Sequence, residues 1–486
     1  MLTNIFFVAI GVFAGIYVGA IPGLSVTMAC SLLIAMTFSW ETHAALAVMI
    51  GVYVGGVYGG SRAAILLNIP GAPAAVATTF DGYPLAQKGE AGKAIALSTL
   101  TSVVGGLVGL LALWLAAPVV SRFALSFSPR DYFLLTTMGL LLVGSISGKS
   151  IAKGLFSASC GLMLGIVGMD PISGVGRFTF NSVNLRGGIS YIAVMIGLFG
   201  VGEALYQIKN RNKEIVRQNV DKIRPPKDKL LRYLPLSLQS GIIGTLVGAL
   251  PGAGGEIAAM FSYDLAKRTV RIPEVRFGEG AYEGVVAPES SNNAAVGGAL
   301  IPMLTLGIPG DSVTAILIGA LAIHGIRTGP MVMVSNPDLF NVIVQLLLLA
   351  NLFLLVFGMM GIRIFAKLTE VPRGILTPLI IVISVIGSYS INNMPSDIVW
   401  TLIFGVVGYC MKCTDFPVAP LVLGLILGPV IEINFRRAVI GANGLTGLLI
   451  EIVTNPLSLV LFALIVLALT TQILSHVRQR KAAKKS

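Results

Sequence analysis

The sequence predicts an all-α polytopic membrane protein, built as two inverted repeats that contain broken helices and re-entrant hairpins. Three observations lead to this fold class: 55% of the 486 residues are hydrophobic, only 12% are charged, and apolar runs recur along the whole chain. A soluble domain carries about 25% charged residues, whereas an apolar run of about 20 residues is long enough to cross a bilayer as a helix. We expect roughly 11–14 membrane segments, hairpins included.

The apolar runs fall into two length classes. Longer runs fit whole membrane spans, and shorter ones fit half-helices or re-entrant hairpins, because a short helix cannot cross the bilayer alone. In chain order, the longer runs cover residues 4–21, 44–67, 94–120, 132–148, 151–168, 189–208, 234–250, 339–362, 375–391, 398–411, 416–431 and 455–475. The shorter runs cover residues 24–38, 254–266, 292–308 and 312–326.

Glycine is unusually frequent, with 57 residues in the chain. Small residues let membrane helices approach closely, which matters because lipid gives apolar side chains no reason to associate. Several glycines recur every four residues, so they form a stripe on one face of a helix. These stripes are Gly11, Gly15 and Gly19; Gly51, Gly55 and Gly59; and Gly244, Gly248 and Gly252.

Two motifs occur twice. Gly15–Gly23 reads GIYVGAIPG and Gly244–Gly252 reads GTLVGALPG, with six of nine positions identical. Leu67–Gly71 reads LNIPG and Leu306–Gly310 reads LGIPG. Repetition of both motifs in the same order predicts two structural repeats.

The repeats define the domain organisation. We expect an N-terminal membrane repeat at 1–208, a basic cytoplasmic linker at 209–232, a C-terminal membrane repeat at 233–475 and a basic cytoplasmic tail at 476–486. The linker contains nine Lys or Arg residues, and basic loops stay in the cytoplasm. The N-terminus carries no basic residue in its first three positions, so it is expected outside. The repeats would then have opposite orientations, as in many secondary transporters.

Each repeated motif ends in a Pro-Gly pair inside an apolar run. Proline removes a backbone donor and clashes with the preceding turn, and glycine permits backbone angles that other residues avoid. A helix that restarts after the break exposes free N–H groups and a positive dipole end, which favour an anion. The alternative is a structural kink, but recurrence in both repeats favours a binding site. The predicted substrate-binding pairs are Pro22-Gly23, Pro70-Gly71, Pro251-Gly252 and Pro309-Gly310.

Small polar residues accompany the breaks. Hydroxyl and amide groups can replace water around a carboxylate without adding charge, and their oxygens can hold Na⁺; helix capping is the alternative role. We predict a possible Na⁺ site at Asn292 and Asn293. The polar residues predicted to bind substrate are Ser25, Asn68, Ser290, Ser291, Asn292, Asn293 and Ser312.

Ionisable residues near the breaks are costly in a membrane unless they are satisfied. Arg62 lies eight residues before Pro70; it could meet a substrate carboxylate, or equally a partner acid or backbone carbonyls. For the acidic residues, capping of a helix N-terminus is the default role. The residues predicted to couple transport to a cation are Glu289, Thr305, Asp311 and Thr314.

Several function classes are disfavoured. The sequence has no H-E-x-x-H, G-x-S-x-G or Walker A motif, so we expect no enzyme, no cofactor and no ATP-driven pump. The net charge of +12 is concentrated in the linker and the tail, which indicates membrane topology rather than nucleic-acid binding. An intramembrane enzyme or a non-transporting scaffold remains an alternative, as does a symporter for another small solute.

Long segments resemble a known family. Gly278–Gly310 reads GEGAYEGVVAPESSNNAAVGGALIPMLTLGIPG, Tyr58–Pro84 reads YGGSRAAILLNIPGAPAAVATTFDGYP, and Gly248–Gly255 reads GALPGAGG. They resemble the large membrane subunit of tripartite tricarboxylate transporters, the TctA type. The resemblance implies a bacterial inner-membrane protein that works with a small four-span membrane subunit and a periplasmic solute-binding protein. It also implies import of a carboxylate such as citrate, driven by Na⁺ or H⁺.

Overall fold

The structure is a computed structural model that describes residues 2–21, 24–146, 150–209, 227–271, 273, 275–360 and 373–483. Within these residues the chain is helical, apart from loops and one small antiparallel hairpin of strands β1 (Gly168–Met169) and β2 (Gly176–Arg177). The all-α prediction is therefore confirmed.

The helices of the first half are α1 (Leu2–Ala20), α2 (Val26–Thr37), α3 (Thr42–Leu67), η1 (Pro73–Ala75), α4 (Val76–Gln87), α5 (Ala91–Ala124), α6 (Pro129–Ile146), α7 (Ile151–Gly165), α8 (Val183–Arg186), α9 (Tyr191–Met195), the π-helical η2 (Ile196–Val201) and α10 (Gly202–Lys209). Those of the second half are α11 (Lys227–Gly248), α12 (Gly254–Thr269), α13 (Glu283–Leu306), α14 (Ser312–Ile323), α15 (Val332–Ser335), α16 (Pro337–Met360), α18 (Arg373–Asn392), α19 (Pro395–Cys413), α20 (Ala419–Gly441), α21 (Leu445–Thr454) and α22 (Pro456–Ala483).

Many of these helices have the length and composition of membrane spans. Among the described residues, seven helices are long and apolar enough to cross a bilayer. A further pair, α21 and α22, meets at 98°, as in a broken span or a re-entrant loop. Four shorter apolar helices accompany them, α2, α7 and α14 among them. The chain is thus a multi-pass membrane protein.

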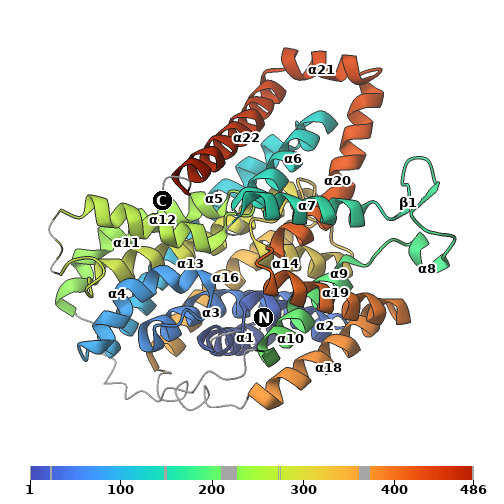
Figure 1. The fold of residues 1–486 in the computed structure, drawn as a ribbon. Helices are drawn as coiled ribbons and strands as arrows, with labels where there is room; N and C mark the ends of the chain where they lie inside the picture. Colours follow the sequence, from blue (N-terminus) through green and yellow to red (C-terminus); the bar gives the residue numbers. More distant parts are fainter. Residues whose placement is uncertain are drawn as a thin grey trace.

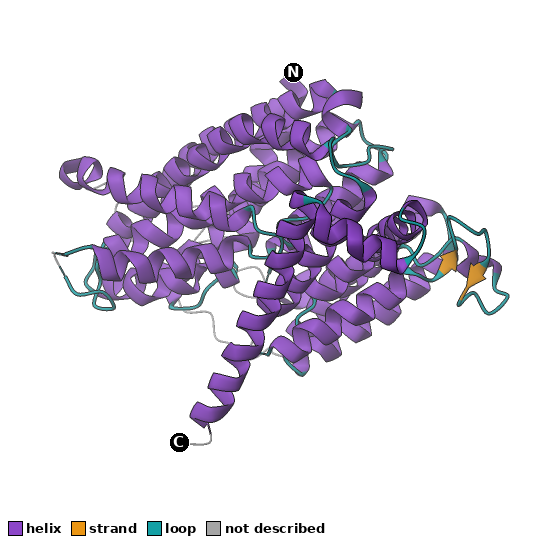
Figure 2. Cartoon of the chain, turned by 90° about the horizontal axis from the view of Figure 1, so that it is seen from above, coloured by secondary structure: helices purple, strands orange, loops and turns teal. Residues whose placement is uncertain are grey.

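Figure 1 shows that most helices pack into one large body, from which α20, α21 and α22 extend beside α6 as an arm. Figure 2 shows the C-terminal helix leaving this body on one side and the β1–β2 hairpin on another. The predicted halves are interleaved rather than separate, because α5 packs against α13 and α7 packs against α20. The domain boundaries and the inverted orientation of the repeats remain predictions, and residues 210–226 of the predicted linker lie outside the described part of the chain.

Helix α13 differs from its prediction. The sequence suggested a short apolar piece at 292–308, but the helix is continuous from Glu283 to Leu306 and is buried from Glu283 to Thr305. Its polar residues made it look interrupted. A membrane helix tolerates such residues where their polar groups form hydrogen bonds inside the protein. The short-piece interpretation was therefore wrong.

The glycine stripes let helix backbones touch. A Cβ added to Gly15 of α1 would lie 2.5 Å from the Val52 carbonyl oxygen of α3, and one added to Gly248 of α11 would lie 2.6 Å from the Ala295 oxygen of α13. Real Cβ atoms do not approach oxygens so closely. The pairs α1–α3 and α11–α13 therefore use the same contact, as the repeated glycine spacing predicts.

This contact gives a direct stability prediction. Gly15→Leu should force α1 away from α3 and lower the yield of folded protein, because overpacking costs about 1–3 kcal/mol or more. Gly441→Leu is the matched control, since a Cβ at Gly441 meets no atom within 4 Å. The measurement is the fraction of monodisperse protein after detergent extraction. Equal yields for the two variants would contradict the close packing of α1 on α3.

The two helices that precede the second and fourth Pro-Gly pairs end in the same way. Helix α3 ends at Leu67 and is followed by Asn68 in the left-handed conformation, with φ of 52°. Helix α13 ends at Leu306 and is followed by Gly307, with φ of 70°. Glycine and asparagine are the residues that most readily take this conformation. The aligned LNIPG and LGIPG motifs therefore encode the same helix end.

Candidate functional site

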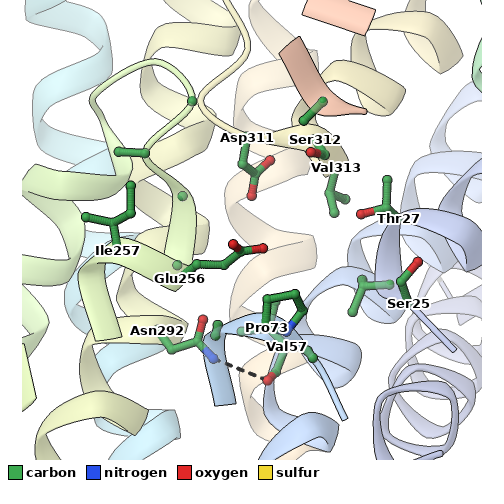
Figure 3. Close-up of a pocket in the computed structure, with 18 of the residues that line it drawn as sticks. Ser25, Thr27, Val57, Pro73, Glu256, Ile257, Asn292, Asp311, Ser312 and Val313 are labelled. Atoms are coloured by element: carbon green, nitrogen blue, oxygen red, sulfur yellow. Dashed lines mark hydrogen bonds between the residues drawn. The ribbon is translucent and has the colours of Figure 1, made fainter. Parts of the chain in front are cut away.

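The segments that follow all four predicted breaks meet at one cavity of about 330 Å³, which we call the central cavity. Figure 3 shows side chains from α2, α12, α13 and the start of α14 converging on it. The lining residues are Ser25, Val26, Thr27, Tyr53, Val57, Ala72, Pro73, Ala74, Gly252, Ala253, Gly254, Gly255, Glu256, Ile257, Asn292, Asp311, Ser312, Val313, Pro417, Val418, Ala419 and Leu423.

Helix N-termini border the central cavity. Helix α2 begins after Ser25, whose hydroxyl accepts a hydrogen bond from the Met28 N–H at 3.1 Å. Helix α12 begins at Gly254 and α14 at Ser312, and both residues line the cavity. The short helix η1, which leads into α4, begins there at Pro73. A helix N-terminus carries N–H groups without a partner inside the helix and a partial positive charge.

Two carboxylates also face this space. The Asp311 carboxylate caps α14 by accepting from the Thr314 N–H at 2.8 Å, and it accepts a hydrogen bond from the Tyr53 hydroxyl. Glu256 extends from the first turn of α12 toward Asp311 across the cavity (Figure 3). The lining contains no Lys, Arg or His. The polar surface therefore combines helix N-termini with acids, and no basic side chain contributes.

Asn292 of α13 supplies an amide to the wall of the central cavity. Its Nδ2 donates to the Val57 carbonyl oxygen at 3.4 Å (Figure 3), and the side chain is only 2% exposed. A Cβ at Gly255 would overlap the Asn292 Oδ1, so Gly255 leaves the room that this amide occupies. The local backbone of α12 and the side chain of α13 are thus fitted to each other.

Glu289, one turn before Asn292 and Asn293, lies in a second polar group that we call the Glu289 cluster: Glu289, Thr78, Ser98 and Ser102. The Thr78 hydroxyl donates to Oε1 of Glu289 at 2.5 Å, and Ser98 and Ser102 donate to Oε2 at 3.3 and 3.2 Å. Glu289 is 1% exposed. Its hydrogen-bond partners on α4 and α5 are all hydroxyls, so no cation balances its charge within the described cluster.

The structure brings five predicted site residues to the central cavity: Ser25, Gly252, Asn292, Asp311 and Ser312. Pro22 and Gly23 lie outside the described residues. The following predicted residues do not line the cavity: Asn68, Pro70, Gly71, Pro251, Ser290, Ser291, Asn293, Glu289, Thr305, Pro309, Gly310 and Thr314.

Some of these other residues shape the breaks or join helices. The Gly252 N–H donates to the Gly310 carbonyl oxygen at 2.7 Å, which ties the third break to the fourth. The Ser290 hydroxyl bonds to the Ser237 hydroxyl at 2.6 Å, linking α13 to α11. Thr305 donates to a carbonyl of its own helix. These hydrogen bonds run within the protein and not into the central cavity.

Arg62 is directed away from the central cavity. Its guanidinium donates to the Gly358 carbonyl oxygen at 2.7 Å and to the Phe357 oxygen at 3.4 Å, and its Nε donates to the Tyr58 hydroxyl at 3.2 Å. The sequence left three partners open for Arg62: a substrate carboxylate, an acidic side chain or backbone carbonyls. The structure matches the third, because Arg62 binds carbonyl oxygens near the C-terminal end of α16.

Asn292 and Asn293 do not face the same space. Successive residues on a helix point in different directions, and Asn293 donates to the Ser102 hydroxyl at 2.8 Å and lines a separate small cavity. One Na⁺ held jointly by both side chains does not fit this geometry, because only Asn292 lines the central cavity.

Asp81 is a buried carboxylate near the site that the sequence did not predict. Its Oδ1 accepts from the backbone N–H groups of Gly278, Gly280 and Ala281 at 2.8–2.9 Å, and its Oδ2 accepts from the Tyr263 hydroxyl at 2.9 Å. The carboxylate on α4 therefore fixes the turn that leads into α13. An acid inside an otherwise apolar segment is the signal that could have identified it.

Asp81→Ala should strongly destabilise the fold, because each donor left without a partner costs about 1–3 kcal/mol. Asp264→Ala is the control: its ion pair with Arg268 on the same helix is exposed, and such pairs contribute about 0–1 kcal/mol. Thermal unfolding of both purified variants checks the difference. A midpoint for Asp81→Ala within a degree of the control would show that this carboxylate does not hold the turn.

The chain is similar to two uncharacterized proteins of Agrobacterium vitis. The chain is 36% identical over 479 residues to an uncharacterized 52.8 kDa protein in the TAR-I ttuC' 3' region of Agrobacterium vitis, covering 98% of this chain and 95% of the relative. It is 38% identical over 238 residues to an uncharacterized protein in the TAR-II ttuC' 3' region of the same organism, covering 49% of this chain and 97% of that relative. No solved structure matches the chain.

A sequence model of the tripartite tricarboxylate transporter TctA family matches residues 5–423. The match includes all four Pro-Gly pairs and every residue that lines the central cavity. Since it covers most of the sequence, this chain belongs to the tripartite tricarboxylate transporter TctA family, a family of transporter components and not of enzymes.

Proposed function

We propose that this chain is the translocating subunit of a secondary transporter in the bacterial inner membrane that imports small carboxylates. It would receive its substrate, a tricarboxylate or dicarboxylate such as citrate, from a periplasmic solute-binding protein. It would act together with a small four-span membrane subunit. The observation that carries the proposal is the convergence of the segments after all four breaks on one cavity.

The size and chemistry of the central cavity support a small anion. About 330 Å³ is near the lower limit of ligand pockets, so it suits a compact molecule better than a nucleotide or a peptide. Helix N-termini bind anions through free N–H groups and the helix dipole. Ser25, Ser312 and Asn292 would add hydrogen bonds that fix the orientation of the carboxylates.

The acids of the cavity favour cation coupling. Glu256 and Asp311 would repel a carboxylate substrate unless a cation or a proton accompanies it. Moving an anion inward against an inside-negative potential costs about 2.3 kcal/mol per charge per 100 mV. A gradient of Na⁺ or H⁺ would offset both costs. Glu289, Thr305, Asp311 and Thr314 are the proposed coupling residues, and no organic cofactor is needed.

The test is uptake of labelled citrate and of a panel of dicarboxylates into proteoliposomes that contain this chain and the small membrane subunit. The binding protein is added outside, and an inward Na⁺ or H⁺ gradient is imposed. Accumulation should require the gradient and the binding protein. Uptake of no carboxylate in the panel, from vesicles in which the chain is shown to be folded, would overturn the proposal.

A further inference from the structure

The two copies of each Pro-Gly motif contribute equivalent positions to the lining of the central cavity. Residues 25–27 are the second to fourth after the first Pro-Gly pair, and residues 254–256 are the second to fourth after the third pair. Residues 72–74 and 311–313 are the first three after the second and fourth pairs. All of these residues line the cavity, so the same segment of each motif contributes to its wall.

The helices that lead to the second and fourth breaks show the same pairing. Tyr53 of α3 lies 17 positions before Pro70, and Asn292 of α13 lies 17 positions before Pro309. Both side chains line the cavity. Two matched sets of residues therefore contribute to the lining. We call them the repeat-one wall, residues 25–27, 53 and 72–74, and the repeat-two wall, residues 254–256, 292 and 311–313.

The two walls differ in charge. The polar side chains of the repeat-one wall are the hydroxyls of Ser25, Thr27 and Tyr53, and that wall has no acid. The repeat-two wall contains both acids of the cavity: Glu256, at the position equivalent to Thr27, and Asp311. Figure 3 shows Ser25 and Thr27 on one side of the space and Glu256 extending into it from the other. A ligand in the cavity therefore meets two chemically different faces.

Glu256 is the acid that is available to a ligand. Its side chain is exposed at the cavity, and no hydrogen bond or ion pair from the described residues reaches its carboxylate. Asp311, in contrast, already accepts hydrogen bonds from Tyr53 and Thr314. An ionised carboxylate can only accept hydrogen bonds. The group of an organic ligand that binds to Glu256 is therefore a hydrogen-bond donor.

A carboxylate group of the substrate fits the repeat-one wall better. A helix N-terminus favours an anion, and α2 begins on this wall. The Thr27 hydroxyl in its first turn has no partner among the described residues and is free to donate. At the repeat-two wall, Glu256 and Asp311 would repel a carboxylate. The charge difference between the walls would thus orient a substrate that has a carboxylate on one side and a donor on the other.

We propose that Glu256 determines the specificity of the central cavity by accepting a hydrogen bond from a hydroxyl or ammonium group on the carbon chain of a carboxylate substrate. The inference deepens the proposed function and rests on it. A site that binds such a donor discriminates against the analogue that lacks it, because the acceptor is then left without its partner. Succinate, malate and aspartate provide the comparison: they share one dicarboxylate chain, which carries no donor in succinate, a hydroxyl in malate and an ammonium group in aspartate.

The experiment measures the thermal unfolding midpoint of the purified full chain in detergent during separate titrations with succinate, malate and aspartate at equal ionic strength. A ligand that binds the folded state raises the midpoint, and the concentration dependence of the rise gives its affinity. Malate, aspartate or both should bind about 10- to 100-fold more tightly than succinate, which is the contribution of a hydrogen bond to a charged group. The tighter ligand of the two identifies the donor as a hydroxyl or an ammonium group.

Three variants locate the preference. Glu256→Leu should bind all three dicarboxylates with similar affinity, because it removes the acceptor and retains most of the side-chain volume. Thr27→Val should instead weaken all three by a similar factor, since Thr27 lies on the wall assigned to the carboxylate. Glu451→Gln is the matched control, because it removes a carboxylate that pairs with Arg130 and does not line the central cavity; it should keep the parental preference.

The titrations distinguish a wrong role for Glu256 from a wrong proposed function. Equal affinity of the parent chain for the three dicarboxylates, or a preference that survives in Glu256→Leu, overturns the role of Glu256 and leaves carboxylate binding intact. A Thr27→Val variant that loses only the preference would place the donor on the opposite wall and would also overturn it. If neither these ligands nor citrate shifts the midpoint of the folded chain, the proposed function fails together with this inference. If Glu256→Leu does not fold, Glu256→Ala replaces it, because alanine favours a helix.

Discussion

Asn292→Leu should lower the initial rate of carboxylate uptake by about 10- to 100-fold at subsaturating substrate. The side chain keeps its approximate volume but loses its hydrogen-bonding atoms, and a hydrogen bond to a charged group contributes about 1.5–3 kcal/mol. Asn292 is placed for this role because it lines the central cavity, donates to the Val57 carbonyl oxygen and occupies the room that Gly255 leaves. Uptake of labelled citrate into proteoliposomes is the measurement.

Asn434→Leu is the control for the loss of an asparagine from a membrane helix, because Asn434 donates to a carbonyl of its own helix and does not line the central cavity. Both variants should insert into the membrane and elute as the parent protein does on size exclusion. If Asn292→Leu transports at the parental rate, the substrate does not use this wall of the central cavity. If uptake falls equally in both variants, the effect is one of general stability.

Glu289→Gln should abolish gradient-driven accumulation while preserving exchange of labelled for unlabelled carboxylate. Glutamine retains an oxygen that accepts from Thr78, Ser98 or Ser102, but it cannot carry the charge that a coupled cation must neutralise. Substrate should then equilibrate across the membrane without concentrating. The two assays, accumulation and counterflow, use the same vesicles.

Glu451→Gln is the matched control, because Glu451 pairs with Arg130 at the α21 end of the arm and lines neither cavity. Glu289→Leu should behave differently from Glu289→Gln, since it leaves the hydroxyls of the cluster without their acceptor and should reduce folded protein. Full accumulation by Glu289→Gln would show that Glu289 takes no part in coupling transport to a cation.

The broken helices could be predicted because their signals are local. Adjacent proline and glycine favour the end of a helix, and Ser25 and Asp311 then cap the new N-termini through atoms only three residues away. The left-handed ends at Asn68 and Gly307 follow from the same short motif. The ends of these helices are therefore determined mostly by residues that are adjacent in the sequence.

The rest of the site depends on partners that are distant in sequence. Tyr53 reaches Asp311 across 258 positions, and Asp81 binds backbone groups about 200 positions away. Asn351 of α16 and Asn293 of α13 are distant in sequence but line the same small cavity. No periodicity or motif in the sequence encodes these long-range contacts.

A density map of the purified chain with a saturating tricarboxylate tests the central claim most directly. The account predicts ligand density in the central cavity, within hydrogen-bond distance of the first turns of at least two of α2, α12 and α14. Density for the carboxylate at another place in the protein, with the space between Ser25, Gly254 and Asp311 filled by water alone, would contradict it.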